Sequence, residues 1–155
     1  MRRLAAAVLL ALLVPGIAAA KKLHCTLRAH AEGNANDGEA FSTQMVSPST
    51  GRPVVIEKVP TISEHDVVAF KPYPARNGTF GVIFLLDDHG KLALDTLSIE
   101  HRGRFLYIFV NGRPTAELQI DRRVSDGKLY VASGLTSADI ELMKKDWPII
   151  GAKKK

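Results

Sequence analysis

Acidic and histidine side chains gather at two places in the chain, residues 64–66 (Glu-His-Asp) and residues 87–89 (Asp-Asp-His). Carboxylates and imidazoles can together ligate a divalent metal. Acids at the start of a helix also cap free N–H groups and favour the helix dipole. We interpret both clusters as helix starts. The sequence therefore predicts no metal site, no catalytic residue and no cofactor.

Other chemical motifs are few. The chain has no serine nucleophile elbow, no HExxH, no P-loop and no dinucleotide fingerprint. His24 and His30 are too far apart on one strand to share an ion without further ligands. Asn77-Gly78-Thr79 matches the glycosylation sequon, which matters only in a host that glycosylates exported chains. These observations favour a protein that is not an enzyme.

The first 20 residues have the three parts of a secretory signal. Arg2 and Arg3 are followed by an apolar run from Leu4 to Leu13 and by a small-residue end at Ala20. The run is short for a bilayer that needs about 20 apolar residues. We expect cleavage after Ala20, an exported protein in the periplasm or outside the cell, and no stable membrane insertion afterwards. The alternative is an uncleaved anchor.

The charge of the chain resides at its ends. The formal net charge is +5, but residues 21–152 sum to zero once the leader and the last three lysines are set aside. A nucleic-acid domain carries a basic face, so we expect no nucleic-acid partner. Residues 151–155 are predicted to be a disordered basic tail. Cys25 is the single cysteine, which excludes an internal disulfide, and its alternating strand pattern directs it inward.

Hydrophobic patterns predict the elements of one α+β domain over residues 21–150. Hydrophobic residues make up 46% and charged residues 24%, as in an ordinary globular domain. One helix is expected from Asp87-Asp88 to about Arg102, with Leu92, Ala93, Thr96 and Leu97 inward. A second follows the capping pattern of Thr136 and Asp139 and ends at Pro148. Six or seven strands in a mostly antiparallel sheet complete the prediction. The stretches from which they are drawn are residues 23–29, 41–46, 54–56, 66–70, 79–86, 105–110, 113–120 and 128–132.

The hairpin at Asn111-Gly112 provides the candidate contact surface. This dipeptide is a strong two-residue turn signal, and the register that it implies puts Phe105, Tyr107 and Phe109 on one face. We expect that face to be core. The opposite face is predicted to contact a partner if no helix covers it. Its candidate contact residues are Leu106, Ile108, Thr115 and Glu117.

Residues from about Gly81 to Trp147 resemble a known domain type. An apolar strand leads to Asp88-x-Gly90-Lys91-Leu92-x-Leu94-x-Thr96, and later come Gly127-Lys128-Leu129-Tyr130 and Gly134-Leu135-Thr136. This pattern is similar to the head subdomain of the first periplasmic domain of SecD, a subunit of the bacterial protein-export machinery. Pro114 lies closer to the turn than the corresponding proline of the family. The multi-span region of SecD is absent from the 155 residues, so the resemblance implies a shared domain.

The resemblance implies a function as well as a fold. The SecD head is thought to contact emerging chains, so it implies an exported, non-enzymatic module for a protein or unfolded polypeptide, chaperone-like or related to envelope assembly. One alternative is a secreted enzyme with an unrecognised, scattered active site. Another is an accessory piece of an envelope complex. A pocket joining residues 87–89 to a second polar cluster would favour the enzyme, and an apolar patch on a sheet face would favour binding.

Overall fold

The computed structural model describes residues 22–152. The predicted signal peptide and the three terminal lysines lie outside them. Within this range the chain is an α+β fold, as predicted, with antiparallel sheets and two helices. No helix among these residues is long and apolar enough to cross a membrane.

The helices are α1 (Asp88–Glu100) and α2 (Ser137–Asp146), with 3₁₀ turns η1 (Ala35–Asp37) and η2 (Glu64–Asp66). The strands are β1 (Leu27–Ala31), β2 (Ser42–Val46), β3 (Pro53–Glu57), β4 (Ile62–Ser63), β5 (Val67–Pro74), β6 (Phe80–Leu86), β7 (Phe105–Val110), β8 (Arg113–Gln119) and β9 (Lys128–Leu135).

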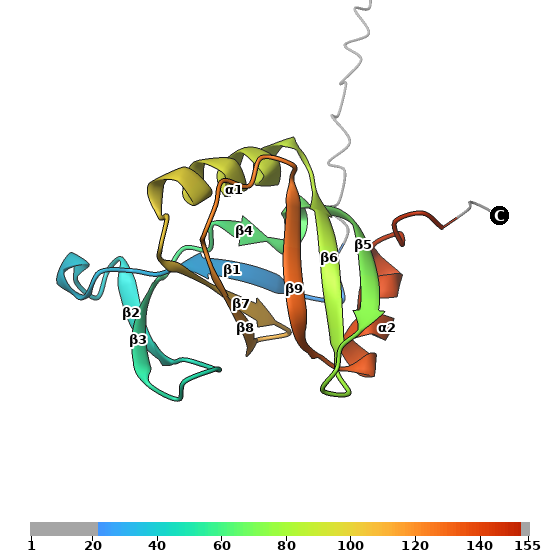
Figure 1. The fold of residues 1–155 in the computed structure, drawn as a ribbon, viewed down its shortest axis with the longest axis horizontal. Coiled ribbons are helices and arrows are strands. Elements are labelled where there is room, and N and C mark those ends of the chain that lie inside the picture. The colour runs from blue at the N-terminus through green and yellow to red at the C-terminus, as the bar shows by residue number, and fades with distance from the viewer. Residues whose placement is uncertain (1–21, 153–155) are drawn as a thin grey trace, which may run out of the picture.

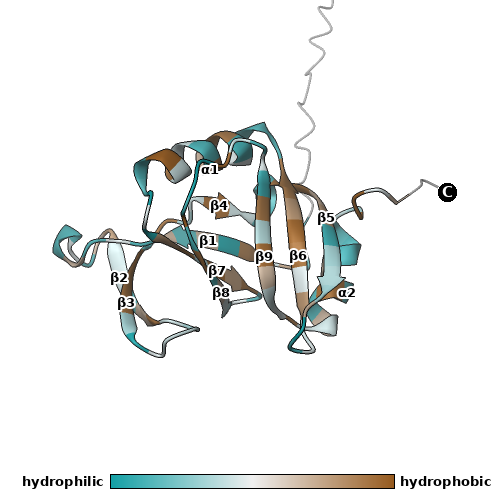
Figure 2. Ribbon diagram, in the orientation of Figure 1, coloured by the Kyte–Doolittle hydropathy of each residue, from teal (hydrophilic) through white to brown (hydrophobic). Residues whose placement is uncertain are grey.

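The strands form three sheets rather than one. Their orders are β4-β1-β7-β8, β2-β3 and β5-β6-β9. The first and third stand as two walls, with α1 across one end and α2 near the other (Figure 1). The β2–β3 hairpin projects to the side. β6 is the middle strand of its sheet, as its apolar run predicts, and Figure 2 shows it as largely hydrophobic. Pro72 and Pro74 lie on the edge strand β5, where a missing N–H is tolerated.

The core fills the space between the two walls. β1 alternates buried and solvent-facing residues, and Cys25, just before it, is fully buried as predicted. Burial, followed by the nearby acids, raises the pKa of the Cys25 thiol to about 12. The Trp147 ring packs edge-on against Phe70 and Phe84, with ring centroids 6.4 and 6.1 Å apart. The predicted inward face of the last helix, Ile140, Met143 and Trp147, is confirmed.

Two carboxylates fix α2 at its ends. Thr136 and Asp139 form the predicted capping box, and Asp139 also accepts hydrogen bonds from Asn111 (2.8 Å) and Arg113 (2.6 Å) of the hairpin turn. Burial raises the pKa of Asp139, but the bonds from Thr136, Asn111 and Arg113 outweigh it and hold that pKa below its usual value. Asp146 accepts bonds from the N–H groups of His24 and Cys25. The helix is thus tied to β1 and to the β7–β8 turn.

The inward face of α1 differs from the prediction. Asp87 is the N-cap and accepts a hydrogen bond from the Gly90 N–H, so the helix start is confirmed. The buried residues are Gly90, Leu94, Leu97 and Ser98, whereas Leu92 is 67% exposed. A Cβ at Gly90 would lie 2.8 Å from the Asp66 Cβ. Because Gly90 lets the helix approach η2 this closely, the Gly90–Leu94–Leu97 side faces the core, and the predicted stripe was wrong except at Leu97.

The main core face of β7 is the one opposite to the prediction, although Tyr107 is buried as predicted. The turn at Asn111-Gly112 is confirmed, with positive φ at both residues. A bulge lies between Ile108 and Phe109, so Leu106 pairs with Leu118 and Ile108 with Ala116. Leu106 and Ile108 are buried, whereas the Phe105 and Phe109 side chains are only partly buried. Leu106, Ile108 and Val110 belong to the main hydrophobic core, whereas Tyr107, although only 3% exposed, lies outside that cluster.

Candidate functional site

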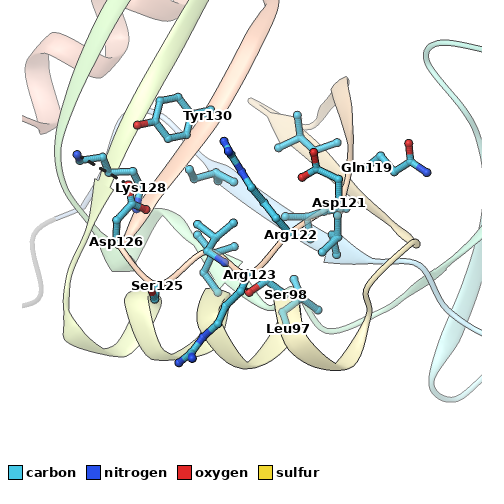
Figure 3. Close-up of a pocket in the computed structure, with 16 residues that line it drawn as sticks. Leu97, Ser98, Gln119, Asp121, Arg122, Arg123, Ser125, Asp126, Lys128 and Tyr130 are labelled. Atoms are coloured by element: carbon cyan, nitrogen blue, oxygen red, sulfur yellow. Dashed lines mark hydrogen bonds and ion pairs between the residues drawn. The ribbon is translucent and has the colours of Figure 1, made fainter.

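A groove lies between two strand edges that no other strand of residues 22–152 covers. β8 is the last strand of the first wall and β9 the last strand of the second, and the two edges face each other. The wide part of this groove is a cavity of about 540 Å³. Its floor is apolar, and its rim carries the connection between the two strands (Figure 3). The floor and rim residues are Leu94, Leu97, Ser98, Leu106, Leu118, Gln119, Ile120, Asp121, Arg122, Arg123, Val124, Ser125, Asp126, Lys128, Leu129 and Tyr130.

The groove narrows toward the hairpin turn. A Cβ at Gly134 of β9 would lie 2.6 Å from the Thr115 carbonyl oxygen of β8, so the two strands touch there. A second cavity of about 220 Å³ lies beside this contact, between the Thr115–Leu118 stretch of β8 and Ala132 and Ser133 of β9. Leu118 lines both cavities. The groove therefore extends along most of β8.

The backbone of β8 presents unpaired groups to the groove. The Ile120 N–H donates to the Arg104 carbonyl across the hairpin. Backbone groups of an antiparallel strand alternate in direction, so Ile120 and Leu118 point toward β7, and Gln119 and Glu117 point toward the groove. The same argument applies to β9. The Leu86 N–H donates to the Gly127 carbonyl, which directs the backbone of Tyr130 into the groove.

Among residues 22–152, the rim cation Arg122 has no acidic partner. Arg123 pairs with Asp95 of α1 through two bonds of 2.6 and 2.8 Å, and these hold its pKa above and the Asp95 pKa below their usual values. Lys128 lies 3.8 Å from Asp126. Arg122 makes no ion pair or side-chain hydrogen bond with any described residue, and its side chain extends into the cavity beside Tyr130 (Figure 3). An unpaired guanidinium above an apolar floor suits a ligand with both apolar and acidic groups.

The four predicted contact residues do not share one face. Ile108 is fully buried in the core, so it is not exposed to a partner. Leu106 is buried but lines the floor of the wide cavity, and Thr115 and Glu117 are partly buried and line the smaller cavity. Contact of a partner with Leu106, Thr115 and Glu117 stays a prediction.

Glu117 has a structural role beside the groove. Its carboxylate accepts hydrogen bonds from the hydroxyl of Ser47, at 2.6 Å, and from that of Ser49. Both serines belong to the turn between β2 and β3. These bonds hold the projecting hairpin against β8. Arg122 and Tyr130 were not predicted as site residues, because the groove depends on how two distant strands face each other.

Comparisons with known proteins concern the fold. No family model matches the chain, and no curated protein matches it significantly in sequence. A solved structure of SecDF, described as a membrane component that enhances protein export, superposes with a TM-score of 0.55 at 13% identity, over 84% of this chain and 69% of that one. The fold is similar to part of SecDF. The super-membrane-facing form of SecDF gives a TM-score of 0.55 at 15% identity, over 83% of this chain and 20% of that one.

The likeness to SecDF confirms the predicted SecD-type fold. The likeness covers 84% of this chain, which is more than the stretch from Gly81 onward that carried the sequence resemblance. At this identity the likeness concerns architecture alone.

The two acid–histidine clusters of the sequence meet in space. The Nδ1 atom of His89 lies 2.7 Å from Oδ1 of Asp66, and ligand atoms of Asp66, Asp87 and His89 lie within 4.8 Å of one another. These are the residues that could hold a metal. Asp66 is also engaged by the N–H and hydroxyl of Ser63, and Asp87 by the Gly90 N–H. The cluster therefore acts as a joint between η2 and α1, and none of its three residues lines the 540 Å³ cavity.

Hydrogen bonding sets the charges of this joint. The bond to Asp66 and the attraction of its charge raise the pKa of His89. Burial raises the pKa of Asp66, but the bonds from Ser63 and His89 outweigh it and leave that pKa below its usual value. Both shifts in pKa therefore favour the ionised forms of Asp66 and His89.

Proposed function

We propose that this protein is an exported, non-enzymatic module that binds polypeptide segments in the groove between β8 and β9. The observation that carries the proposal is that two strand edges, neither paired with another strand of residues 22–152 on this side, face each other beside an apolar floor. Extended chains satisfy such edges with their backbone and fill such floors with their side chains. A small-molecule enzyme would need convergent polar groups over the floor, whereas Arg123 and Lys128 of this rim engage neighbouring acids.

The likeness to SecDF supports a role in protein export. SecDF is described as a membrane component that enhances protein export. The present chain would supply a SecD-type head as a separate domain, residues 21–150, acting as a chaperone for chains in transit or in envelope assembly. The predicted signal peptide supports a periplasmic or extracellular location. Mass spectrometry of the exported protein should then give a mature terminus at Lys21, and an intact Met1 would contradict cleavage.

Photocross-linking tests polypeptide binding directly. Benzoylphenylalanine placed at Tyr130, which is 48% exposed on the groove rim, should cross-link to reduced and carboxymethylated lactalbumin, a chain that stays unfolded in buffer. The matched control is the same label at Leu92, which is 67% exposed and outside the groove. Equal labelling from both positions, or none from Tyr130, would contradict the proposal.

A secreted enzyme with a scattered site is the second candidate. The meeting of Asp66 and His89 supports it, since a titratable pair drawn from two distant segments is a common feature of active sites. An activity that is lost in Asp66→Asn and retained in the cross-linking-defective groove variants would favour the enzyme over the binding module.

A further inference from the structure

We infer that the bound segment adds to the edge of β8 as a further β-strand and places an acidic side chain at Arg122. The inference rests on the proposed polypeptide binding, and it specifies how the segment is held and which side chains it carries. Backbone pairing determines the conformation of the segment, and the groove lining determines its sequence preference.

The edge of β8 can pair with an added strand. Gln119 and Glu117 direct both N–H and C=O toward the groove, and no strand among residues 22–152 pairs with that edge. An uncovered edge of this kind is the template for strand addition. β9 touches β8 at Thr115 and Gly134, and beyond this contact Glu117 lines the smaller cavity and Gln119 the wide one.

The floor selects the side chains of the added strand. Successive residues of a strand point to opposite faces, so every second residue of the segment would point into the cavity. The floor there is made by leucines of α1, β7, β8 and β9, which favours aliphatic side chains at these positions. The intervening residues face solvent and are free to be polar. The floor leucines are Leu94, Leu97, Leu106, Leu118 and Leu129.

The rim selects an acidic residue. Arg122 extends into the cavity without an ion pair, whereas Arg123 and Lys128 have Asp95 and Asp126 beside them. Asp121 precedes Arg122, but no ion pair joins the two. A carboxylate on the segment is the complementary group for this guanidinium. We assign it to a side chain rather than to a C-terminus, because a chain in transit offers mostly internal residues.

Peptide binding tests the backbone pairing. The probe is a fluorescein-labelled, amidated nonapeptide in which valine alternates with threonine and one threonine is replaced by aspartate. N-methylation at alternate positions should weaken binding about 3- to 10-fold for each lost hydrogen bond, and methylation at the intervening positions should have little effect. Uniform tolerance of N-methylation would overturn strand addition. Binding only by the peptide with a free C-terminal carboxylate would overturn the assignment to a side chain.

Variants of the protein test the same contacts. Gln119→Pro removes an outward N–H from an edge strand, where proline is tolerated, and should weaken binding about 3- to 10-fold. Gln119→Ala keeps that N–H and is the matched control. Arg122→Glu should weaken the aspartate peptide about fivefold and favour a peptide with lysine at that position. No exchange of preference between the two peptides would overturn the role of Arg122.

The outcomes separate this inference from the proposed function. If lactalbumin still cross-links at Tyr130 while N-methylation shows no alternation, polypeptide binding stands and strand addition fails. If neither lactalbumin nor the nonapeptides bind, the proposed function fails with it. Should Gln119→Pro not fold, the N-methyl series on the unaltered protein decides the question by itself.

Discussion

Gly134 of β9 faces the carbonyl oxygen of Thr115 in β8 so closely that a Cβ at Gly134 would lie 2.6 Å from that oxygen. Gly134 also has a φ of 101°, a backbone angle that residues with a side chain rarely adopt. This contact joins the two walls at the narrow end of the groove. Because the backbones of β8 and β9 touch here, this contact fixes how far apart the two strands lie at the narrow end.

Replacing Gly134 with Ala should therefore be strongly destabilising. The backbone strain and the contact with Thr115 together predict a loss of about 2–3 kcal/mol in the free energy of unfolding. Gly78→Ala is the control, because Gly78 has a φ of 78° but open space around its Cα. Urea unfolding of both variants measures the difference. Equal losses would mean that strain alone acts and that the strand contact is unimportant.

The start of α1 gives a paired test of capping. Asp87→Ala removes the side chain that accepts from the Gly90 N–H and should lower the free energy of unfolding by about 0.5–2 kcal/mol. Asp88→Ala removes an exposed acid of the first turn and should lower it by only about 0.3–1 kcal/mol. Thermal or urea unfolding compares the two. A larger loss for Asp88→Ala than for Asp87→Ala would contradict the assignment of Asp87 as the N-cap.

The two faces of β7 should respond differently to substitution. Ile108 is fully buried, so Ile108→Asp puts an unpaired charge in the core and should cost more than about 4 kcal/mol. Phe109 is partly buried and stacks edge-on with His30, with ring centroids 5.3 Å apart. Phe109→Ala should cost about 2 kcal/mol, roughly half of a core truncation. Circular dichroism and urea unfolding compare the two losses. A larger loss for Phe109→Ala than for Ile108→Asp would show that Phe109 is the core residue.

The joint between Asp66 and His89 predicts a pH dependence of stability. The folded state raises the pKa of His89 above 6.5, so the stabilisation from protonated His89 is fully present below 6.5 and is lost as the pH rises through the raised value. The folded state lowers the pKa of Asp66 below 3.8, so its stabilisation is fully present above 3.8 and is lost as the pH falls through the lowered value. Stability from the pair is greatest between these limits.

Comparison with a variant isolates this contribution. His89→Gln should reduce the fall in stability between pH 6 and pH 8, as measured by melting temperature. His65→Gln is the control, because His65 is exposed and lies 3.9 Å from Glu64. Identical pH profiles for the unaltered protein and His89→Gln would show that the pair does not stabilise the fold.

Local signals explain which parts of the fold could be predicted from the sequence. The capping box at Thr136 and Asp139, the turn at Asn111-Gly112 and the edge position of Pro72 and Pro74 each depend on residues close together in the chain. The faces of β7 do not. They depend on which side of the first sheet the residues of the other elements cover, and that has no local signal.

The candidate site was harder to predict from the sequence for the same reason, since it depends on contacts between distant segments. Thr115 and Glu117 do line a cavity beside β9, but the free cation Arg122 and the exposed Tyr130 had no pattern to single them out. They become a site only when the edges of two separate sheets face each other. The inward face of α1 was missed because Gly90, a residue without a side chain, determines it through its close approach to Asp66.

The pairing of β1 with β7 delays the completion of the fold. The short strand β4 can pair with one edge of β1 earlier, but across the other edge Ala29 lies opposite Ile108 of β7. That second edge has no partner until about 80 further residues have been made, which takes about 4–16 s at about 5–20 residues per second. Contacts between distant segments also make folding slow. A newly made chain of this topology therefore stays unfolded long enough to be engaged by other proteins before its own first wall can form.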